Sequence, residues 1–341
     1  MDLDPLIAYV EEVVSDSAAA EVPVPVSPTL TSRYRGTLLG VAAGNGLGLP
    51  AEGRSRQWIR GKFPAGLTEL SPDLRNRPWD DDLAQTVMLV QALLDRPGLD
   101  SDDLAQRLLA WASADGDGIG VQTLAVVREI ESGTPAADAA REVWERSGRR
   151  AAGNGAVMRC SPVALAWRRS GIRLVEESER SALVTHHDPR CVWSAIALNV
   201  ALARALSGAS VNIPRLSELL GLAGAPDAVT RAVRLSDGAE IEAFALDDRD
   251  GMGFTLKALQ VGLWCLWQPA NFEGVLVQVV SQGGDTDTNG AVAGAVMGSR
   301  VGVEGIPQRW VASIAQSERL TTLADRLLAR SELGAIQHRG G

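Results

Sequence analysis

The chain has 341 residues, of which 45% are hydrophobic, and its formal net charge is −9 at pH 7. This composition supplies enough apolar side chains for a large core, and the acidity argues against a broad nucleic-acid-binding surface, which needs clustered basic residues. The three cysteines, Cys160, Cys191 and Cys265, stand singly among apolar neighbours, so we interpret them as reduced core residues of a cytoplasmic protein. The N-terminus lacks the basic segment of a signal peptide, and the apolar stretches are too short to span a bilayer, so we expect no membrane association.

The first 30 residues differ in pattern from the rest of the chain. The segment from Leu6 to Val14 predicts a short helix. Residues 22–28 contain three prolines, which exclude a helix and predict an extended linker. We therefore assign residues 1–30 to a short helix and linker outside the main domain.

Helical periodicity dominates residues 31–331. One apolar stripe has the spacing i, i+4, i+7 and i+11 and consists of Leu83, Val87, Val90 and Leu94. The best strand candidate is the run at 275–280, which is rich in β-branched residues. Because the segments on both sides of it have helical patterns, we interpret it as a buried helix. The sequence thus predicts an all-α fold with one compact domain over residues 31–331 and a polar tail at 332–341.

Two segments repeat glycine every fourth residue: Gly36, Gly40, Gly44 and Gly48, and then Gly290, Gly294, Gly298 and Gly302. On a helix this spacing makes a ridge almost without side chains, at a cost of roughly 1 kcal/mol per glycine relative to alanine. Tight packing of two core helices would explain the ridges without any functional role. If the helices pack antiparallel against each other, Glu52 comes close to Asp285 and Asp287.

Two acidic clusters lie about two hundred residues apart. The first is Trp79-Asp80-Asp81-Asp82, and the second is Gly283-Gly284-Asp285-Thr286-Asp287-Thr288. The second cluster begins like an EF-hand loop, but the twelfth position is Val296 instead of the bidentate glutamate that calcium needs there. One aspartate of the first cluster is expected to cap the helix that follows, yet capping needs only one carboxylate.

The remaining carboxylates favour a cation site. At ~4 Å, each pair of like charges costs roughly 1 kcal/mol in water and roughly 4 kcal/mol at an effective dielectric constant of 20, and bound cations offset that repulsion. Carboxylate and hydroxyl oxygens suit Mg²⁺, Mn²⁺ or Ca²⁺, and the sequence has no His/Cys cluster for zinc. Five aspartates and a threonine exceed the needs of one Mg²⁺ ion, so two ions about 3.5–4 Å apart would use them better.

Three further loops are candidates for ligand contact. Residues 153–159 and 115–120 are rich in glycine, which lets backbone N–H groups approach phosphate oxygens, although a plain turn between helices has the same composition. Residues 185–189 hold the pair His186 and His187 before a predicted helix. Helix capping or solvent exposure competes with ligand contact as the explanation of that pair.

Taken together, these segments resemble the ADP-ribosylglycohydrolase family, related to dinitrogenase-reductase-activating glycohydrolase. The resemblance covers nearly all of residues 33–331, in family order. Its motifs are Arg35 to Gly40 with Gly48 to Glu52 in the opening helix, Trp79 to Asp82 and Gly283 to Thr288 as metal motifs, the ligand loops Gly118 to Thr123 and Gly153 to Arg159, and the element Thr185-His186.

The resemblance implies an all-α fold with a dinuclear Mg²⁺ centre, for which Mn²⁺ could substitute, at the bottom of an ADP-ribose cleft. It implies a hydrolase that releases ADP-ribose from a modified protein side chain, nucleic acid or small molecule. We expect a monomer, although the sequence does not fix the oligomeric state. The implied metal ligands are Asp80, Asp81, Asp82, Asp285, Asp287 and Thr288. The implied ligand-binding residues are Gly118, Gly120, Asn154, Gly155, Met158 and His186. Glu52, or an aspartate of the centre such as Asp81 or Asp285, would assist proton transfer.

Three positions depart from the family pattern. Asp80 stands where the family has threonine, Leu83 where a second threonine or serine is common, and Asn45 where aspartate is frequent. Because of these departures, one alternative is that the protein is a catalytically inactive relative that binds ADP-ribose. A two-metal phosphoesterase acting on a nucleotide diphosphate is a further alternative, and its products would be nucleoside monophosphates.

Overall fold

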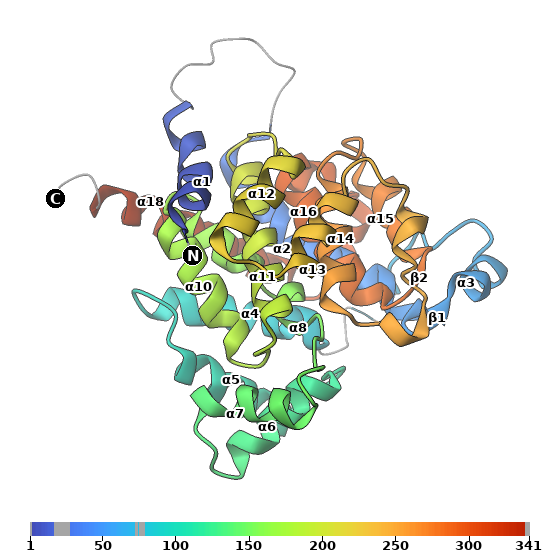
Figure 1. The fold of residues 1–341 in the computed structure, drawn as a ribbon. Coiled ribbons are helices and arrows are strands. Elements are labelled where there is room, and N and C mark those ends of the chain that lie inside the picture. The colour runs from blue at the N-terminus through green and yellow to red at the C-terminus, as the bar shows by residue number, and fades with distance from the viewer. Residues whose placement is uncertain (1, 17–27, 72–73, 75–78, 338–341) are drawn as a thin grey trace.

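The computed structural model describes residues 2–16, 28–71, 74 and 79–337. Most of these residues form α-helices, which confirms the predicted all-α class (Figure 1). The proline-containing linker predicted at residues 22–28 lies outside the described residues except for its last position.

The α-helices are α1 (Asp4–Asp16), α2 (Leu30–Gly48), α3 (Arg56–Lys62), α4 (Asp81–Asp95), α5 (Ser101–Ala114), α6 (Val121–Glu131), α7 (Ala136–Arg146), α8 (Gly155–Met158), α9 (Ser161–Trp167), α10 (Gly171–Leu183), α11 (Pro189–Leu206), α12 (Ile213–Ala223), α13 (Asp227–Leu235), α14 (Thr255–Cys265), α15 (Phe272–Val280), α16 (Thr286–Val301), α17 (Gln308–Ser313) and α18 (Ser317–Gln337). Short 3-10 helices are η1 (Leu49–Ala51), η3 (Ile241–Phe244), η4 (Arg249–Gly251) and η5 (Val303–Gly305), and the strands are β1 (Arg54–Ser55) and β2 (Gly283–Gly284).

Helices α2 and α16 form the centre of the fold, and they pack antiparallel, backbone against backbone, as the glycine spacing predicts. A Cβ atom placed on Gly44 would lie 1.9 Å from the carbonyl oxygen of Gly290, and one on Gly40 would lie 2.1 Å from that of Gly294. No side chain fits at these distances. The contact therefore explains why glycine occupies these helical positions in spite of its cost to helix stability. The last glycine of the second ridge, Gly302, lies just beyond α16 and ends it with a φ of 71°.

The other helices cover this pair. Helices α4, α11, α14, α15 and α18 pack around α2 and α16, and one large hydrophobic core joins them. The run at 275–280 lies in α15, so its interpretation as helix is confirmed. Helices α5, α6 and α7 form a lobe at one end of the molecule with its own small apolar cluster (Figure 1), made of Val126, Ala139, Ala140 and Val143.

Both ends of the described chain are helical. The predicted N-terminal helix is confirmed as α1, and it buries Leu6, Tyr9 and Val10 against the helices around α10 and α12. At the other end, α18 continues to Gln337. The domain boundaries at residues 30 and 331 stay predictions.

The three cysteines are buried and form no disulfide, as expected of core residues. Burial raises the pKa of Cys160 and of Cys265 to about 12, so these thiols stay protonated. Among the described helices, none is both long and apolar enough to cross a bilayer.

Candidate metal and ligand site

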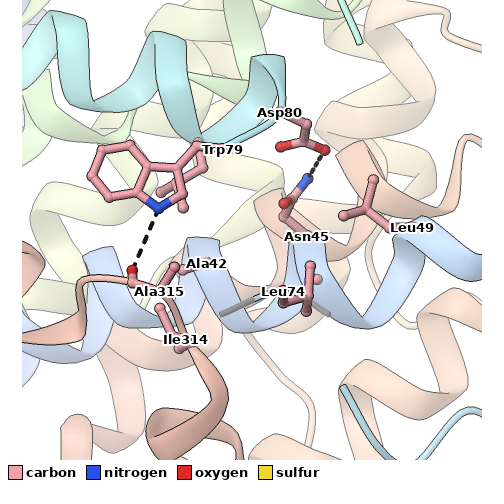
Figure 2. A pocket seen from close by; sticks show the side chains of 10 residues that line it. Ala42, Asn45, Leu49, Leu74, Trp79, Asp80, Ile314 and Ala315 are labelled. Carbon is pink, nitrogen blue, oxygen red and sulfur yellow. Dashed lines mark hydrogen bonds between the residues drawn. The ribbon is translucent and has the colours of Figure 1, made fainter. Parts of the chain in front are cut away.

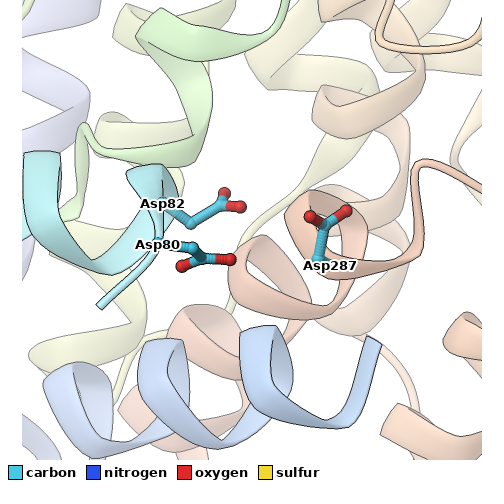
Figure 3. Close-up of side chains that lie close together, drawn as sticks. All are labelled: Asp80, Asp82 and Asp287. Carbon is cyan, nitrogen blue, oxygen red and sulfur yellow. The ribbon is translucent and has the colours of Figure 1, made fainter. Parts of the chain in front are cut away.

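The two acidic clusters meet at the N-terminal ends of α4 and α16. Asp80 is the N-cap residue of α4 and Asp82 lies in its first turn, while Asp287 lies in the first turn of α16. Figure 3 shows these three carboxylates directed toward one another from the two helices. Each offers an oxygen atom within 4.8 Å of the other two, and all three residues are buried. The partial positive charge of a helix N-terminus favours carboxylates at both places.

Capping does not account for this cluster. Although Asp80 occupies the N-cap position, its side chain makes no capping hydrogen bond. Oxygen Oδ1 of Asp82 and Oδ1 of Asp287 are buried and accept no hydrogen bond within the described part of the chain. Buried carboxylate oxygens without donors are costly unless a cation satisfies them. The buried acidic triad is therefore consistent with a metal site.

The electrostatics of the cluster lead to the same conclusion. Burial, followed by the charges of Asp81 and Asp287, raises the pKa of Asp82 well above its ordinary value. Burial and the neighbouring Asp285 and Glu52 raise the pKa of Asp287 in the same way. Burial, Asp80 and Asp285 raise the pKa of Asp81 to about 8, although the Gly120 N–H donates a hydrogen bond that opposes the shift. So many carboxylates in one place hold protons unless cations replace them.

Neutral donors orient these carboxylates. The side-chain amide of Asn45 donates to Asp80 Oδ2 at 2.8 Å and to Asp82 Oδ2 at 3.2 Å. The Thr288 hydroxyl donates to Asp82 Oδ2 at 3.3 Å. Sequence reasoning noted Asn45 only as a departure from a family pattern and missed it as a partner of both aspartates. Its position three residues before the last glycine of the first ridge was not a signal, because the contact depends on where α4 begins.

All three departures lie around one small cavity. Asp80, Asn45 and Leu83 line it together with Trp79, whose indole N–H donates to the carbonyl oxygen of Ala315 (Figure 2). Its volume is about 30 Å³, which is room for one or two water molecules. Asp80 therefore borders this small cavity and does not line the main one.

The main cavity, which we call the ligand cavity, has a volume of about 500 Å³. This is the range of small-molecule sites. The structure brings together at its surface the predicted residues Glu52, Asp81, Gly118, Gly120, Asn154, Gly155, Met158, His186, Asp285, Asp287 and Thr288. Asp80 and Asp82 lie behind this surface. The roles of all these residues in binding and catalysis stay predictions.

A short antiparallel strand pair brings Glu52 to the cavity. Strand β1 pairs with β2, and the Gly53 N–H donates to the Gly284 carbonyl at 2.8 Å. Glu52 lies two residues before β1, with Gly53 between them, and Asp285 immediately follows β2. Glu52 is exposed and lines the same cavity as Asp285, which Asn154 holds through a hydrogen bond of 2.8 Å to Oδ2.

The loop before α8 is packed against a histidine. A Cβ atom on Gly155 would lie 2.6 Å from His186 Cε1, and one on Gly153 would lie 3.3 Å from His186 Nε2. The Gly153 N–H donates to Gln122 Oε1 at 3.1 Å, and the Asn154 N–H donates to the Gly253 carbonyl at 2.9 Å. Glycine is needed here because the imidazole occupies the space of its side chain.

The two adjacent histidines have different surroundings. His186 is buried and lines the cavity, whereas the ring of His187 packs on Trp144 at 5.2 Å between centroids and does not line it. Asp188 caps α11 by accepting from the Arg190 N–H. The capping explanation thus applies to Asp188, and neither histidine caps the helix.

Sequence reasoning also missed part of the cavity wall. Gln122, Met252 and Gly253 line the cavity, as do the apolar side chains of Val121 and Val143. Gln122 lies within the predicted loop and could have been singled out as a polar residue beside its glycines. Nothing in the sequence connects residues 252–253 with the site, because tertiary packing alone brings them there.

Comparison with known proteins agrees with this geometry. The family model for ADP-ribosylglycohydrolase matches residues 26–335. The chain is 28% identical to the mouse ADP-ribosylhydrolase ARH3, with 87% of this chain and 91% of that protein covered. It is 25% identical to the ADP-ribosylarginine hydrolase Tri1 of Pseudomonas putida, covering 88% of this chain and 78% of Tri1.

A solved structure has the same fold. It is described as an ADP-ribosylglycohydrolase-related protein complex, and it matches with a TM-score of 0.70 and 29% sequence identity over 89% of this chain and 99% of that one. The family match extends from before α2 to within α18, and so includes both acidic clusters and the ligand cavity. The chain belongs to the ADP-ribosylglycohydrolase family.

Proposed function

We propose that this protein is a Mg²⁺-dependent hydrolase that cleaves the glycosidic bond between ADP-ribose and a modified side chain or related acceptor. The observation that carries the proposal is the buried carboxylate cluster at one end of a 500 Å³ cavity. Glycine-containing loops beside this cluster form another part of the cavity surface, where backbone N–H groups can approach a diphosphate. The names of the relatives, which act on ADP-ribosylated groups, support the same reaction class.

In this proposal, Asp80 and Asp82 would hold the metal ions from behind the cavity surface, and Asp81, Asp285, Asp287 and Thr288 would hold them from the cavity side. Mg²⁺ suits this set because all of its donors are carboxylate or hydroxyl oxygens. When bound, the ions supply positive charge that orients ribose hydroxyls and stabilises negative charge at the reacting oxygen.

The chain's own residues supply positioning and proton transfer. Asn154 and the Gly120 N–H orient Asp285 and Asp81 through hydrogen bonds. Glu52 is the exposed carboxylate at the cavity, and we assign to it the acceptance of a proton from the attacking water. The water oxygen bonds to the anomeric carbon of ribose as the bond to the acceptor breaks, and the acceptor leaves with one proton, which balances the proton that Glu52 accepts from the water.

The test is release of free ADP-ribose from a substrate panel, with Mg²⁺ and again with excess chelator. The panel contains ADP-ribosylated arginine, ADP-ribosylated serine, ADP-ribosylated nucleic acid and ADP-ribose 1″-phosphate. Magnesium-dependent release from one member establishes the hydrolase and identifies the acceptor. Tight binding of ADP-ribose without release from any member would contradict the proposal and favour an inactive binder, and nucleoside monophosphate products would favour a phosphoesterase.

A further inference from the structure

A buried chain of hydrogen bonds leads from the acidic site to His186. Gln85 donates to Asp81 Oδ2 at 3.5 Å, a long contact, and accepts from Arg159 Nη1 at 2.6 Å. Arg159 Nη2 donates to the Thr185 hydroxyl oxygen at 2.6 Å, and that hydroxyl lies 2.7 Å from His186 Nδ1. Arg159 and His186 are each 1% exposed and Thr185 is fully buried.

The direction of these hydrogen bonds follows from the arginine. A guanidinium only donates, so the Thr185 oxygen accepts from Arg159. The single hydroxyl hydrogen of Thr185 then has one neighbouring acceptor within the described residues, Nδ1 of His186. If Nδ1 carried a hydrogen instead, the hydroxyl hydrogen would be buried without an acceptor, which is unfavourable.

The other ring nitrogen must then carry the hydrogen of the neutral imidazole. Nε2 lies on the side of the ring next to Gly153 and Gly155, both of which line the ligand cavity. Within the described residues the ring's one hydrogen bond is at Nδ1, so Nε2 has no protein partner there. Burial and the charge of Arg159 lower the pKa of His186 to about 3, so the ring stays neutral at ordinary pH.

We propose that Arg159 and Thr185 hold His186 in the Nε2–H tautomer, so that the ring donates a hydrogen bond to an oxygen atom of the ligand in the cavity. Arg159 is a positioning residue in this arrangement, since it acts through Thr185. The identity of the ligand as ADP-ribose rests on the proposed function, whereas the tautomer does not. The donor serves an acceptor oxygen of the diphosphate or of the distal ribose.

The decisive measurement is the pair of ring ¹⁵N resonances of His186 in the full-length protein. The chain has only three histidines, so comparison with His186→Gln assigns the signals. We expect Nδ1 to show the shift of an unprotonated nitrogen and Nε2 that of a protonated one. We also expect the Nε2–H resonance to move when ADP-ribose is added with Mg²⁺. A proton on Nδ1 would overturn the tautomer, and an unmoved Nε2–H signal in the bound state would overturn the ligand contact.

A matched pair of variants tests the role of the hydroxyl. Thr185→Val removes the hydrogen bond to Nδ1 at nearly constant shape, and Thr185→Ser keeps it. By calorimetry, Thr185→Val should weaken ADP-ribose binding on the order of tenfold and move the Nδ1 resonance, while Thr185→Ser should stay within about twofold of the wild type. Equal affinities of the two folded variants would overturn the positioning role. If Thr185→Val does not fold, the wild-type resonances decide the tautomer alone.

These results are separable from the proposed function. A wild-type protein that shows the expected tautomer and binds ADP-ribose, but releases none from any substrate, supports the inference and contradicts the hydrolase. A protein that hydrolyses a substrate but carries the ring hydrogen of His186 on Nδ1 supports the hydrolase and contradicts the inference.

Discussion

The two sides of the ligand cavity are built differently. The acidic side stands on α2 and α16, whose backbones touch at glycines, and Asp287 there is only 6% exposed. The other side belongs in part to the lobe of α5, α6 and α7, where the separate apolar cluster is small and the cavity-lining Val121 is 88% exposed. A backbone contact leaves no room for an added atom, whereas an exposed side chain can be replaced by many others. We infer that the acidic side is fixed by the needs of the reaction and that the side chains of the lobe side can vary with the substrate.

The largest expected effect comes from one buried charge on the acidic side. Asp287→Asn should lower turnover by at least about a thousandfold, which is about 4 kcal/mol of transition-state stabilisation, because a neutral amide is a poor Mg²⁺ ligand. In chelator at pH 8 the variant should unfold at a temperature no lower than the wild type, since it removes one of several repelling carboxylates. Added Mg²⁺ should raise the unfolding temperature of the wild type more than that of the variant.

Turnover and thermal unfolding, with and without Mg²⁺, measure both effects. The matched control is Asp102→Asn, a first-turn aspartate of α5 that is exposed. It should leave turnover and the Mg²⁺-dependent rise unchanged. Near-normal turnover of Asp287→Asn would remove the basis for assigning the chemistry to this side.

The next effect concerns packing alone. In Gly44→Ala the new methyl group would lie 1.9 Å from the Gly290 carbonyl oxygen. Helices α2 and α16 would have to separate, and we expect a loss of about 3 kcal/mol or more in the free energy of unfolding. Urea titration followed by circular dichroism measures it.

Gly61→Ala is the matched control, since a Cβ atom there has no neighbour within 4 Å. Because alanine favours a helix over glycine, that change should stabilise slightly or have no effect. Equal stabilities of the two variants would show that α2 and α16 are not in backbone contact.

A third prediction concerns the exchange of polar groups at residues 45 and 80. Asn45→Asp replaces the donor of two hydrogen bonds with a further carboxylate facing Asp80 and Asp82. The chelated protein should lose about 2 kcal/mol of stability by repulsion. The double change Asn45→Asp and Asp80→Thr keeps the number of carboxylates constant and should recover most of this loss in a urea titration. If the double variant is no more stable than the single one, the two positions do not compensate each other.

The smallest effect is expected on the lobe side. Val121→Ser changes an exposed side chain at the cavity, so the unfolding temperature should stay the same. Affinity for ADP-ribose should fall by about threefold, because the ligand then covers less apolar area. Calorimetry measures the affinity, and thermal unfolding measures the stability. A large loss of stability would mean that the lobe is as constrained as the acidic side.

Much of the fold was predictable because its signals are local. Apolar spacing predicted α4, and the helical neighbours of residues 275–280 predicted α15 in spite of a β-branched composition. The glycine ridges predicted which two helices touch, since only close backbone approach requires so many glycines. Asn45 and Met252 were missed as parts of the site because the groups they meet there lie far away in the chain, whereas Gln122 had a local signal beside the loop glycines.

The sequence by itself determined the chemical character of this protein: helices, two clusters of hard oxygen ligands, and loops able to approach a phosphate. Residue types and short spacings encode these properties, so they can be read without coordinates. Only the tertiary structure decided that oxygens of Asp80, Asp82 and Asp287 come within 4.8 Å of one another. It also decided that His186 faces the cavity and His187 packs on Trp144. Distances between remote segments depend on how the helices pack, and burial, which sets the pKa values, exists only in the folded state.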